Sequence, residues 1–382
     1  MNKIILYTAA GLMLAACSPK NTTIEVSNTL GFDRNGELVS ATIADARLGK
    51  LVDASGNEVA YQVKDNQILF QASVAANSTS TYTMLSSEAA SEVEPLTTAF
   101  FLGDRRKDDF CWENDKAAYR MYGPALLPEN PSSGVDLWLK HSSQLTADAM
   151  YRQEEGGKPY HVDYGLGIDS YKVGHAAGCG GVAIYTPDGQ IWPGGPFKTW
   201  EILQQGPLQT VFRLTYDSVQ VADKVWNETI TITVNAGAQV NKAEVCFTGD
   251  PVEGVMIGGA YFHHDDLSND LSVKVGDSQI IACAEPATSD KGIYRVHEQM
   301  GIDATALDFG RNYVVVIVPG ADGTGCAGAT EYAVKDYEMG QTVTYYFGGG
   351  WSKRDFATDE EWFNASKQTA QAISAPLQVT VK

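Results

Sequence analysis

The stretch "LQTVFRLTYDSVQVADKVWNETITITVNAG", residues 208–237, decides the fold class. It contains two segments, 208–216 and 228–237, in which apolar and polar residues alternate. In the second segment the threonines face one side of an extended chain, and the isoleucines and the valine face the other. Alternation of this kind is typical of a strand with one buried face, so the stretch predicts two long β-strands.

Strand patterns continue on both sides of this stretch. Residues 313–319, "YVVVIVP", form a continuous apolar run that is typical of a strand buried on both faces, and residues 341–351 alternate. Between residues 24 and 90, short strand patterns are separated by turn residues. The sequence therefore predicts an N-terminal β-rich subdomain at 24–90 and a larger β domain at 91–382.

One helix is predicted near the end of the chain. Thr358 and Glu361 fit a capping box ahead of "EWFNASKQTAQAI", and Pro376 ends the helix before a final strand. Many strands and few helices predict an all-β protein built on a large antiparallel β-sandwich. Residues 206–247 resemble the central strands of galactose-mutarotase-like domains, which implies a supersandwich whose concave sheet face binds carbohydrate.

The N-terminus predicts export and lipid anchoring. Lys3 precedes an apolar run at 4–16, which is too short to span a bilayer but suits a signal peptide. The run ends in "LAAC", which resembles the lipobox of bacterial lipoproteins and implies acylation of Cys17; a plain secretory signal is the alternative. With a signal peptide at 1–17 and a tether at 18–23, the protein is expected at the envelope of a Gram-negative bacterium, on the periplasmic side or the cell surface.

Charge and cysteine content limit the partners. The chain has 28 Lys and Arg against 47 Asp and Glu, a formal net charge of −19. This disfavours nucleic acid and anionic lipid surfaces as partners, so membrane contact is expected through the lipid anchor only. An acidic glycan stays compatible, because a local Arg/Lys pocket can outweigh the global charge. The five cysteines after Cys17 form no C-x-x-C and predict buried thiols rather than a zinc knuckle or a disulfide framework.

The segment "DDFCWENDKAAYRMYGPAL", residues 108–126, contains the first candidate site residues. Taken as one extended strand, it places aromatic, amide and guanidinium groups on a shared face: Trp112, Asn114, Arg120 and Tyr122. Aromatic rings cover the C–H face of a sugar, and an arginine pairs with a carboxylate through two hydrogen bonds. A half-exposed structural strand is the alternative interpretation.

A second segment, "YHVDYGLGIDSYKVGHAAGCGG" at 160–181, is rich in glycine and histidine. His161 and Asp163 share a face if the chain is extended, and the glycines allow a bend that brings Tyr164 to them. His175 follows in a second glycine-rich loop. A structural role for each histidine is the alternative.

Two further segments carry candidates. Trp192 begins a glycine- and proline-rich loop and would form the rim of a pocket, or else a structural turn. In "AYFHHDD", residues 260–266, the adjacent histidines face opposite sides of a strand, so at most one, such as His264, enters a given site. Asp265 and Asp266 offer oxygen ligands to a hard cation such as calcium. The sequence has no metalloprotease, dinucleotide-binding, P-loop or serine-hydrolase motif.

Four of these segments, including 192–216 and "GGGWSKRDF" at 348–356, together resemble a bacterial family known as domain of unknown function 4861 (DUF4861). The resemblance covers most of the chain after about residue 25. It implies a secreted lipoprotein from polysaccharide-utilisation loci of Bacteroidetes, related to enzymes that process uronic-acid oligosaccharides by elimination.

The predicted function is β-elimination on uronic-acid-containing oligosaccharides by a carbon–oxygen lyase or a dehydratase, which gives a 4,5-unsaturated uronate. This reaction requires a neutralised carboxylate, a base for the C5 proton and an acid for the departing oxygen. Arg120 would neutralise the carboxylate, and His161 and Tyr164 would form the base/acid pair. His175 and His264 are the alternates for either role.

The predicted substrate-binding residues are Trp112, Glu113, Asn114, Tyr122, Asp163 and Trp192. Hydrolysis is an alternative, with two carboxylates drawn from Glu113, Asp115, Asp163 and Glu201. A sugar epimerase or mutarotase and a non-catalytic glycan-binding lipoprotein are further alternatives. No cofactor is predicted other than a divalent cation such as calcium, in place of Arg120 as the neutralising charge.

Overall fold

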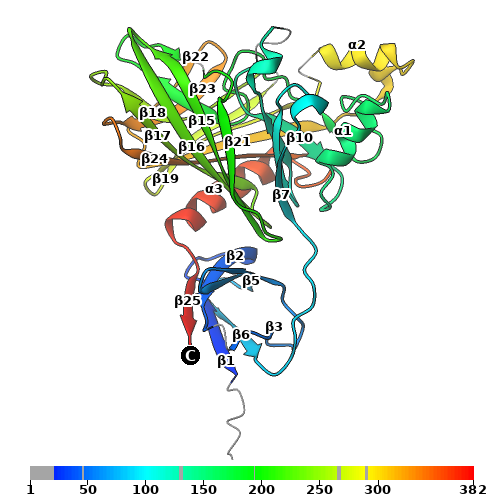
Figure 1. The fold of residues 1–382 in the computed structure, drawn as a ribbon, viewed down its shortest axis with the longest axis vertical. Helices are drawn as coiled ribbons and strands as arrows, with labels where there is room; N and C mark the ends of the chain where they lie inside the picture. Colours follow the sequence, from blue (N-terminus) through cyan, green and yellow to red (C-terminus); the bar gives the residue numbers. More distant parts are fainter. Residues whose placement is uncertain (1–20, 45–46, 129–131, 193, 265–267, 289–290) are drawn as a thin grey trace, which may run out of the picture.

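The computed structural model describes residues 21–382 except 45–46, 129–131, 193, 265–267 and 289–290 (Figure 1). The predicted signal peptide with Cys17 lies outside the described residues, and so do Asp265 and Asp266. The same holds for the side chain of Trp192.

The alternating stretch forms the centre of a long antiparallel sheet. β15 (Gln209–Val221) pairs with β16 (Lys224–Asn235), and Ile230, Ile232 and Val234 are fully buried while the threonines between them are half-buried, so the predicted alternation is confirmed. The full order of this eight-stranded sheet is β14 (Thr199–Gln204), β15, β16, β17 (Val240–Gly249), β24 (Thr342–Trp351), β21 (Arg311–Pro319), β20 (Ser278–Pro286) and β19 (Asn269–Val275).

A five-stranded sheet packs against the inner face of the eight-stranded sheet. Its order is β13 (Ile191–Trp192), β12 (Gly181–Tyr185), β18 (Met256–Phe262), β23 (Thr330–Asp336) and β22 (Gly323–Ala327). A Cβ atom on Gly259 of β18 would lie 2.6–2.7 Å from Tyr345 and Val316, so glycine permits the close approach of the two sheets. The side chains between the sheets belong to the main core of the protein.

A third sheet and two short helices form one end of the large unit. The sheet contains β7 (Thr97–Phe101), β8 (Phe110–Asn114), β9 (Ala118–Met121), β10 (Asp136–Lys140) and β11 (Gly167–Asp169). Helices α1 (Ala147–Glu155) and α2 (Gly292–Gln299) lie at this end in Figure 1. Neither helix was predicted, because each is only nine or eight residues long.

The prediction of one extended strand through residues 108–122 is wrong. The chain turns at 115–117, and β8 and β9 form a hairpin in which Trp112 is opposite Tyr119 and Cys111 is opposite Arg120. Because neighbouring positions on a strand face opposite sides of the sheet, Trp112 and Arg120 lie on opposite faces.

The remaining predicted helix is confirmed. α3 (Asp359–Ser374) begins after Thr358, whose hydroxyl accepts the N–H of Glu361. Short 3₁₀ turns lie at 103–105, 124–126 and 304–306. Among the described residues, none of the helices combines the length and the apolar character that crossing a bilayer requires.

The N-terminal residues form a separate small β unit with its own core. One sheet contains β25 (Gln378–Val381), β1 (Thr22–Ser27), β6 (Thr79–Leu85) and β3 (Lys50–Val52), and the other contains β2 (Arg34–Thr42), β5 (Gln67–Val74) and β4 (Tyr61–Lys64). The last strand of the chain thus pairs with the first, below the large unit in Figure 1. The all-β sandwich class with a C-terminal helix is confirmed.

Candidate active site

A pocket of about 270 Å³ lies at the end of the large unit that carries α2. Its charged and aromatic walls come from the loop before β8, from β9 and the residue after it, from the segment 160–174 and from α2. They include Arg106, Arg120, Tyr122, Tyr160, His161, Asp169, Lys172 and Arg295. Its volume is just below the usual range of about 300–1,000 Å³ for ligand pockets. The pocket therefore suits a small polar group, such as one terminal sugar of a chain.

Sheet register places a buried ionic cluster at the floor of this pocket. Arg120 of β9 is directly opposite Asp136 of β10, and Trp138, on the same face as Asp136, is opposite Asp169 of β11. The Arg120 guanidinium donates to Asp136 at 2.6 Å, to Asp169 at 3.1 Å and to Asp109 at 3.2 Å. These three carboxylates compensate the buried guanidinium and fix its orientation.

The same guanidinium is surrounded by aromatic rings. Its carbon lies 4.9 Å from the ring centre of Tyr122, 5.1 Å from that of Trp138 and 5.3 Å from that of Tyr160. The hydroxyls of Tyr122 and Tyr160 accept further hydrogen bonds from Arg120. Every nitrogen of Arg120 thus has a partner within the protein, and its contribution to a bound ligand is its charge beneath the pocket.

Tyr160 links Arg120 to a second arginine. Its phenolic oxygen accepts N–H bonds from Arg106 at 2.8 and 3.1 Å and from Arg120 at 3.1 Å. Burial raises the pKa of Tyr160, and the positive charges of the two arginines oppose this shift. Three donors directed at one phenol oxygen stabilise its phenolate, so they reduce the upward shift that burial gives the pKa of Tyr160.

His161 stands at the mouth of the pocket with one ring nitrogen fixed. Nδ1 lies 2.9 Å from the backbone carbonyl oxygen of Asp169. A carbonyl oxygen only accepts hydrogen bonds, so Nδ1 carries the proton and Nε2 keeps a lone pair. The surrounding protein lowers the pKa of His161 by disfavouring its charged form, and the Arg120 charge acts in the same direction. His161 is therefore a neutral base near pH 7.

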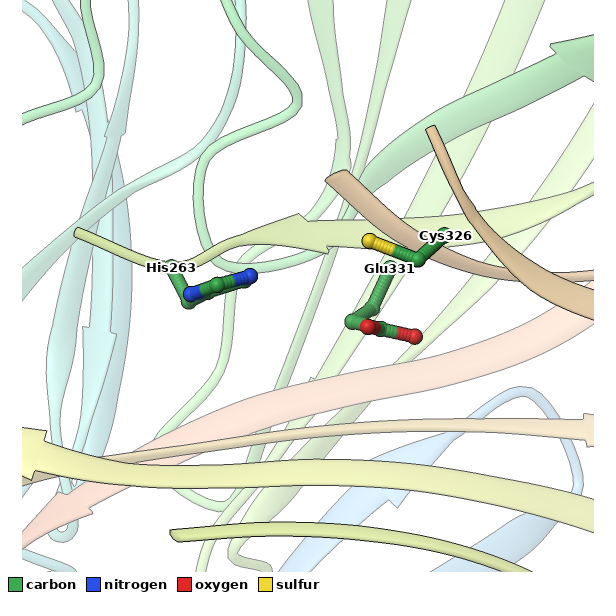
Figure 2. Close-up of side chains that lie close together, drawn as sticks. All are labelled: His263, Cys326 and Glu331. Carbon is green, nitrogen blue, oxygen red and sulfur yellow. The ribbon is translucent and has the colours of Figure 1, made fainter. Parts of the chain in front are cut away.

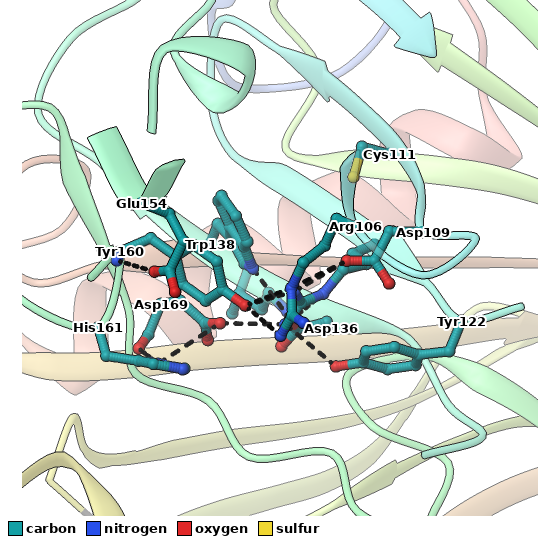
Figure 3. A network of polar contacts seen from close by, with 12 residues as sticks. Arg106, Asp109, Cys111, Tyr122, Asp136, Trp138, Glu154, Tyr160, His161 and Asp169 are labelled. Atoms are coloured by element: carbon teal, nitrogen blue, oxygen red, sulfur yellow. Dashed lines mark hydrogen bonds and ion pairs between the residues drawn. The ribbon is translucent and has the colours of Figure 1, made fainter. Parts of the chain in front are cut away.

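Figure 3 shows how these groups face one another. The imidazole of His161 and the phenol of Tyr122 extend from opposite sides of Asp136 toward the centre of the network. The side chain of His161 is 40% exposed, whereas Tyr122 is 6% exposed. A ligand in the pocket would thus meet an accessible base on one side and a buried phenol on the other.

The charge of the pocket lining contrasts with that of the whole chain. Four lining residues are cationic and one, Asp169, is a carboxylate, in a protein with a net charge of −19. Arg295 and Lys172 are exposed at the rim, and the side chain of Arg106 is 32% exposed. Asp109 and Asp136 lie behind the lining, and burial raises the pKa of Asp109. The rim is thus suited to an anionic ligand.

Residues 26–379 match the family described as a domain of unknown function, DUF4861. The chain belongs to the DUF4861 family. It is also similar to a protein of Formosa agariphila called "Uncharacterized protein P7", with 24% identity over 421 residues and 99% of each chain covered.

Two solved structures resemble this DUF4861 chain in fold. One is an alpha-mannosidase from Enterococcus faecalis (TM-score 0.53, 8% identity, covering 95% of this chain and 46% of that one). The other is a protein in glycosyl hydrolase family 38 from the same organism (TM-score 0.51, 8% identity, covering 96% of this chain and 48% of that one). The chain spans about half the length of either structure, and at this identity the likeness concerns the fold alone. The galactose-mutarotase-like class stays a prediction.

The DUF4861 pocket unites some of the residues proposed from sequence. His161, Arg120 and Tyr122 all line it. Tyr164 does not, and its ring faces Lys158. His175 is exposed in a loop outside the lining.

His264 lies behind the pocket wall. Its Nδ1 lies 2.7 Å from Glu285, and Nε2 bonds to the backbone carbonyl of Lys172. Its ring packs edge-on against Tyr171. His264 therefore holds the segment that carries two lining residues, and it does not itself line the pocket.

The proposed binding residues of β8 lie in the core. Trp112 is fully buried and stacks on Tyr119. Asn114 donates to two backbone carbonyls, and the Glu113 carboxylate accepts the N–H groups at the start of α1 and bonds to Lys140. These contacts hold the sheet and α1 together beneath the site.

Asp163 belongs to a neighbouring pocket. Its carboxylate lies 2.6 Å from His141 Nε2, and it helps to line a cavity of about 300 Å³ with Trp351 and Lys353. Tyr160 and His161 line the candidate active site, whereas Val162 and Asp163 line this second cavity.

Sequence reasoning missed Tyr160, Asp169, Arg106, Lys172 and Arg295. Tyr160, Asp169 and Lys172 lie within the quoted histidine-rich segment, so the segment was identified but these members of it were not. No sequence pattern marked Arg295 as a site residue, because its helix, α2, was not predicted.

Proposed function

We propose that this protein is an enzyme that acts on uronic-acid-containing oligosaccharides by β-elimination in the pocket of His161. The observation that carries the proposal is the hydrogen bond from His161 Nδ1 to the Asp169 carbonyl, which leaves Nε2 as a neutral base beside a cationic rim. A base and a positive rim around a small pocket are what abstraction of a proton next to a carboxylate requires.

The carboxylate of the substrate would bind at the rim rather than to Arg120 alone. Lys172 and Arg295 are exposed and Arg106 is partly exposed, whereas Arg120 is buried with its N–H groups directed at aspartates and tyrosines. Arg120 strengthens this field from below and lines the pocket. Neutralisation of the carboxylate lowers the pKa of the C5 proton and stabilises the enolate-like intermediate.

The elimination itself uses the two sides of the pocket. His161 Nε2 takes the C5 proton, and the electrons of that bond form the C4–C5 double bond while the C4–O bond breaks. Tyr122 or Tyr160 donates a proton to the departing oxygen, since both phenols line the pocket. Tyr160 is favoured for this role by the three N–H bonds that stabilise its phenolate. A departing sugar makes the reaction a lyase reaction, and a departing hydroxyl makes it a dehydration.

Hydrolysis is less favoured by the same geometry. A glycosidase needs two carboxyl groups about 5–9.5 Å apart around the bond. Among the described lining residues the pocket has one carboxylate, Asp169, which is bonded to Arg120. None of the candidates Glu113, Asp115, Asp163 and Glu201 lines it.

A lipid anchor on Cys17, as predicted from the sequence, fits this role. With Cys17 acylated, the enzyme would stand at the cell envelope, where imported or surface-bound acidic oligosaccharides are processed. A divalent cation such as calcium, in place of Arg120 as the neutralising charge, is a further proposal, which addition of a chelator to the assay would test.

The test is an assay with a panel of uronic-acid-containing oligosaccharides. The expected product gains an ultraviolet absorbance, because the new double bond is conjugated with the carboxylate. His161→Ala should lower kcat about 100- to 10,000-fold, the usual contribution of general base catalysis. His175→Ala is the matched control, since that histidine is exposed outside the pocket, and its activity should stay within twofold.

Three outcomes would contradict the proposal. Reducing sugar released without new absorbance would indicate hydrolysis. Binding without turnover would indicate a glycan-binding protein. Full activity of His161→Ala would remove that residue from the mechanism.

A further inference from the structure

A second group of reactive side chains lies at one end of the five-stranded sheet. It consists of His263, Cys326 and Glu331, and one ligand atom from each lies within 4.8 Å of the others. Figure 2 shows the imidazole extending toward the thiol and the carboxylate. None of the three lines the candidate active site, so this group is independent of the proposed function.

Sheet register brings the three residues together. Cys326 of β22 is directly opposite Glu331 of β23, and Glu331 is directly opposite Tyr261 of β18. His263 follows two residues after Tyr261, and its backbone N–H donates to the carbonyl of Ala329 at 3.0 Å. The ligand atoms thus come from two neighbouring strands, β22 and β23, and from the residue that follows β18, and backbone hydrogen bonds set their spacing.

His263 has an unsatisfied ring nitrogen. Its Nδ1 is buried and has no hydrogen-bond partner within the described part of the chain. In Figure 2 one ring nitrogen of His263 lies beside its Cβ and the other faces Cys326 and Glu331. Nδ1 is the nitrogen beside Cβ, so Nε2 is the atom directed at the group, and the case for a site rests on the proximity of the three side chains.

The donor set selects the metal. An imidazole nitrogen, a thiolate sulfur and a carboxylate oxygen are the three ligand types that zinc binds, whereas calcium and magnesium take oxygen ligands. The charges of one thiolate and one carboxylate balance a divalent ion. No C-x-x-C motif is needed, because the ligands are contributed by separate strands.

A second carboxylate lies close to the group. Asp270 of β19 acts electrostatically on Cys326, and it accepts a hydrogen bond from the Tyr261 hydroxyl at 3.4 Å. Outer carboxylates of this kind orient the ligands of a metal and strengthen its binding.

We propose that His263, Cys326 and Glu331 bind one zinc ion, with the fourth position taken by water. The ion links the end of β18 to the β22–β23 hairpin. On binding, the Cys326 thiol releases its proton to solvent and a sulfur–zinc bond forms, with no change of oxidation state.

The test uses the full chain, freed of metal by a chelator, and titrates it with zinc and with cobalt(II). We expect one ion per chain. Cobalt should give a thiolate-to-metal charge-transfer band in the near ultraviolet and the visible bands of a tetrahedral site. Zinc should also protect Cys326 from alkylation, read as the labelled fraction of its peptide by mass spectrometry; this readout needs no variant.

Variants then locate the site. Cys326→Ser and His263→Ala should each weaken zinc binding by more than the roughly 10- to 100-fold that loss of an outer partner costs. Cys246→Ser is the matched control, because Cys246 is a half-buried cysteine of the other sheet, and it should leave affinity unchanged. Cys326 is exposed on a hairpin, so its serine variant is expected to fold.

A cobalt complex without a thiolate band would overturn the assignment. The same conclusion follows if Cys326→Ser binds zinc as tightly as the unmodified chain, or if Cys326 is alkylated equally with and without zinc. Because these readouts do not involve turnover, they are separate from the oligosaccharide assay.

Discussion

Arg120 beneath the pocket and Glu228 on β16 are both buried ionisable side chains, and their surroundings differ. Arg120 contacts three carboxylates and two phenols. Glu228 is 4% exposed, and burial alone raises its pKa to about 8. The groups around Arg120 stay ionised although they are buried, because opposite charges compensate one another. Glu228 is buried without such partners and stays protonated at neutral pH.

The difference shows where this protein maintains charge. A buried charge is stable only when partners replace the water that it loses. The network around Arg120 meets this condition, and it also carries the floor of the pocket with its cationic rim. Glu228 lies beside a small cavity with Tyr216 and Met121 and has no comparable set of partners. A buried charged network, rather than burial of an ionisable group as such, therefore marks the candidate site.

The largest effect is expected for Arg120→Met, which breaks the compensated region. The substitution leaves Asp136 and Asp169 buried without their shared cation, so the free energy of unfolding should fall by about 3–5 kcal/mol. Urea denaturation at pH 7 measures this change. Arg213→Met is the matched control, since Arg213 is 42% exposed and its pair with Glu201 is on the surface; it should change stability by less than about 1 kcal/mol. Equal losses in the two variants would mean that the cluster is not a compensated unit.

The next largest effect is a change in the free energy of unfolding with pH, caused by Glu228. Below about pH 4.5, the ordinary pKa of a glutamate, both folded and unfolded chains hold the proton. As the pH rises toward the folded pKa of about 8, the unfolded chain loses the proton first, so this group makes the protein less stable. Between pH 5 and 7.5 the loss amounts to about 3 kcal/mol.

Glu228→Gln should remove this loss. Denaturation midpoints for both chains at pH 5, 6 and 7.5 would show a growing advantage of the glutamine variant. A difference that stays constant with pH would show that Glu228 is ionised in the folded protein and belongs with the compensated group.

A smaller effect concerns the pH profile of the proposed reaction. The lowered pKa of His161 keeps its imidazole neutral at pH values where an ordinary histidine begins to take up a proton. The acid limb of kcat/KM should therefore lie below pH 6.5 and fall about tenfold per pH unit. An acid limb above pH 6.5 would mean that His161 gains stabilisation of its charged form from the pocket, against the positive charge of Arg120.

The fold was largely predictable because strand alternation is a local signal. Segments 208–216, 228–237 and 313–319 became β15, β16 and β21 with the expected burial. The β8–β9 hairpin was missed, because its turn at 115–117 reads Asp-Lys-Ala and contains neither glycine nor proline.

The site was less predictable than the fold, because its geometry depends on register. Asp109, Asp136 and Asp169 reach Arg120 from three places in the chain, and only strand pairing brings them together. His161 and Arg120 were proposed to share one cavity, and both line the pocket. Arg295 was beyond sequence reasoning, since an eight-residue helix carries little periodic pattern.

The smallest effect is expected for a substitution at the rim of the pocket. It distinguishes the exposed charges of the rim from the buried charges of the floor. Arg295 is exposed on α2, so it contributes attraction for an anionic substrate without holding the fold together. Arg295→Ala should raise KM about two- to fivefold, as exposed charge pairs contribute up to about 1 kcal/mol, and leave kcat and stability unchanged. Added salt should diminish the difference between the variant and the unmodified protein, because screening weakens exposed charges much more than the buried pairs of Arg120. A loss of kcat equal to the rise in KM would instead place Arg295 against the reacting atoms, and the rim would then share the catalytic role assigned to His161.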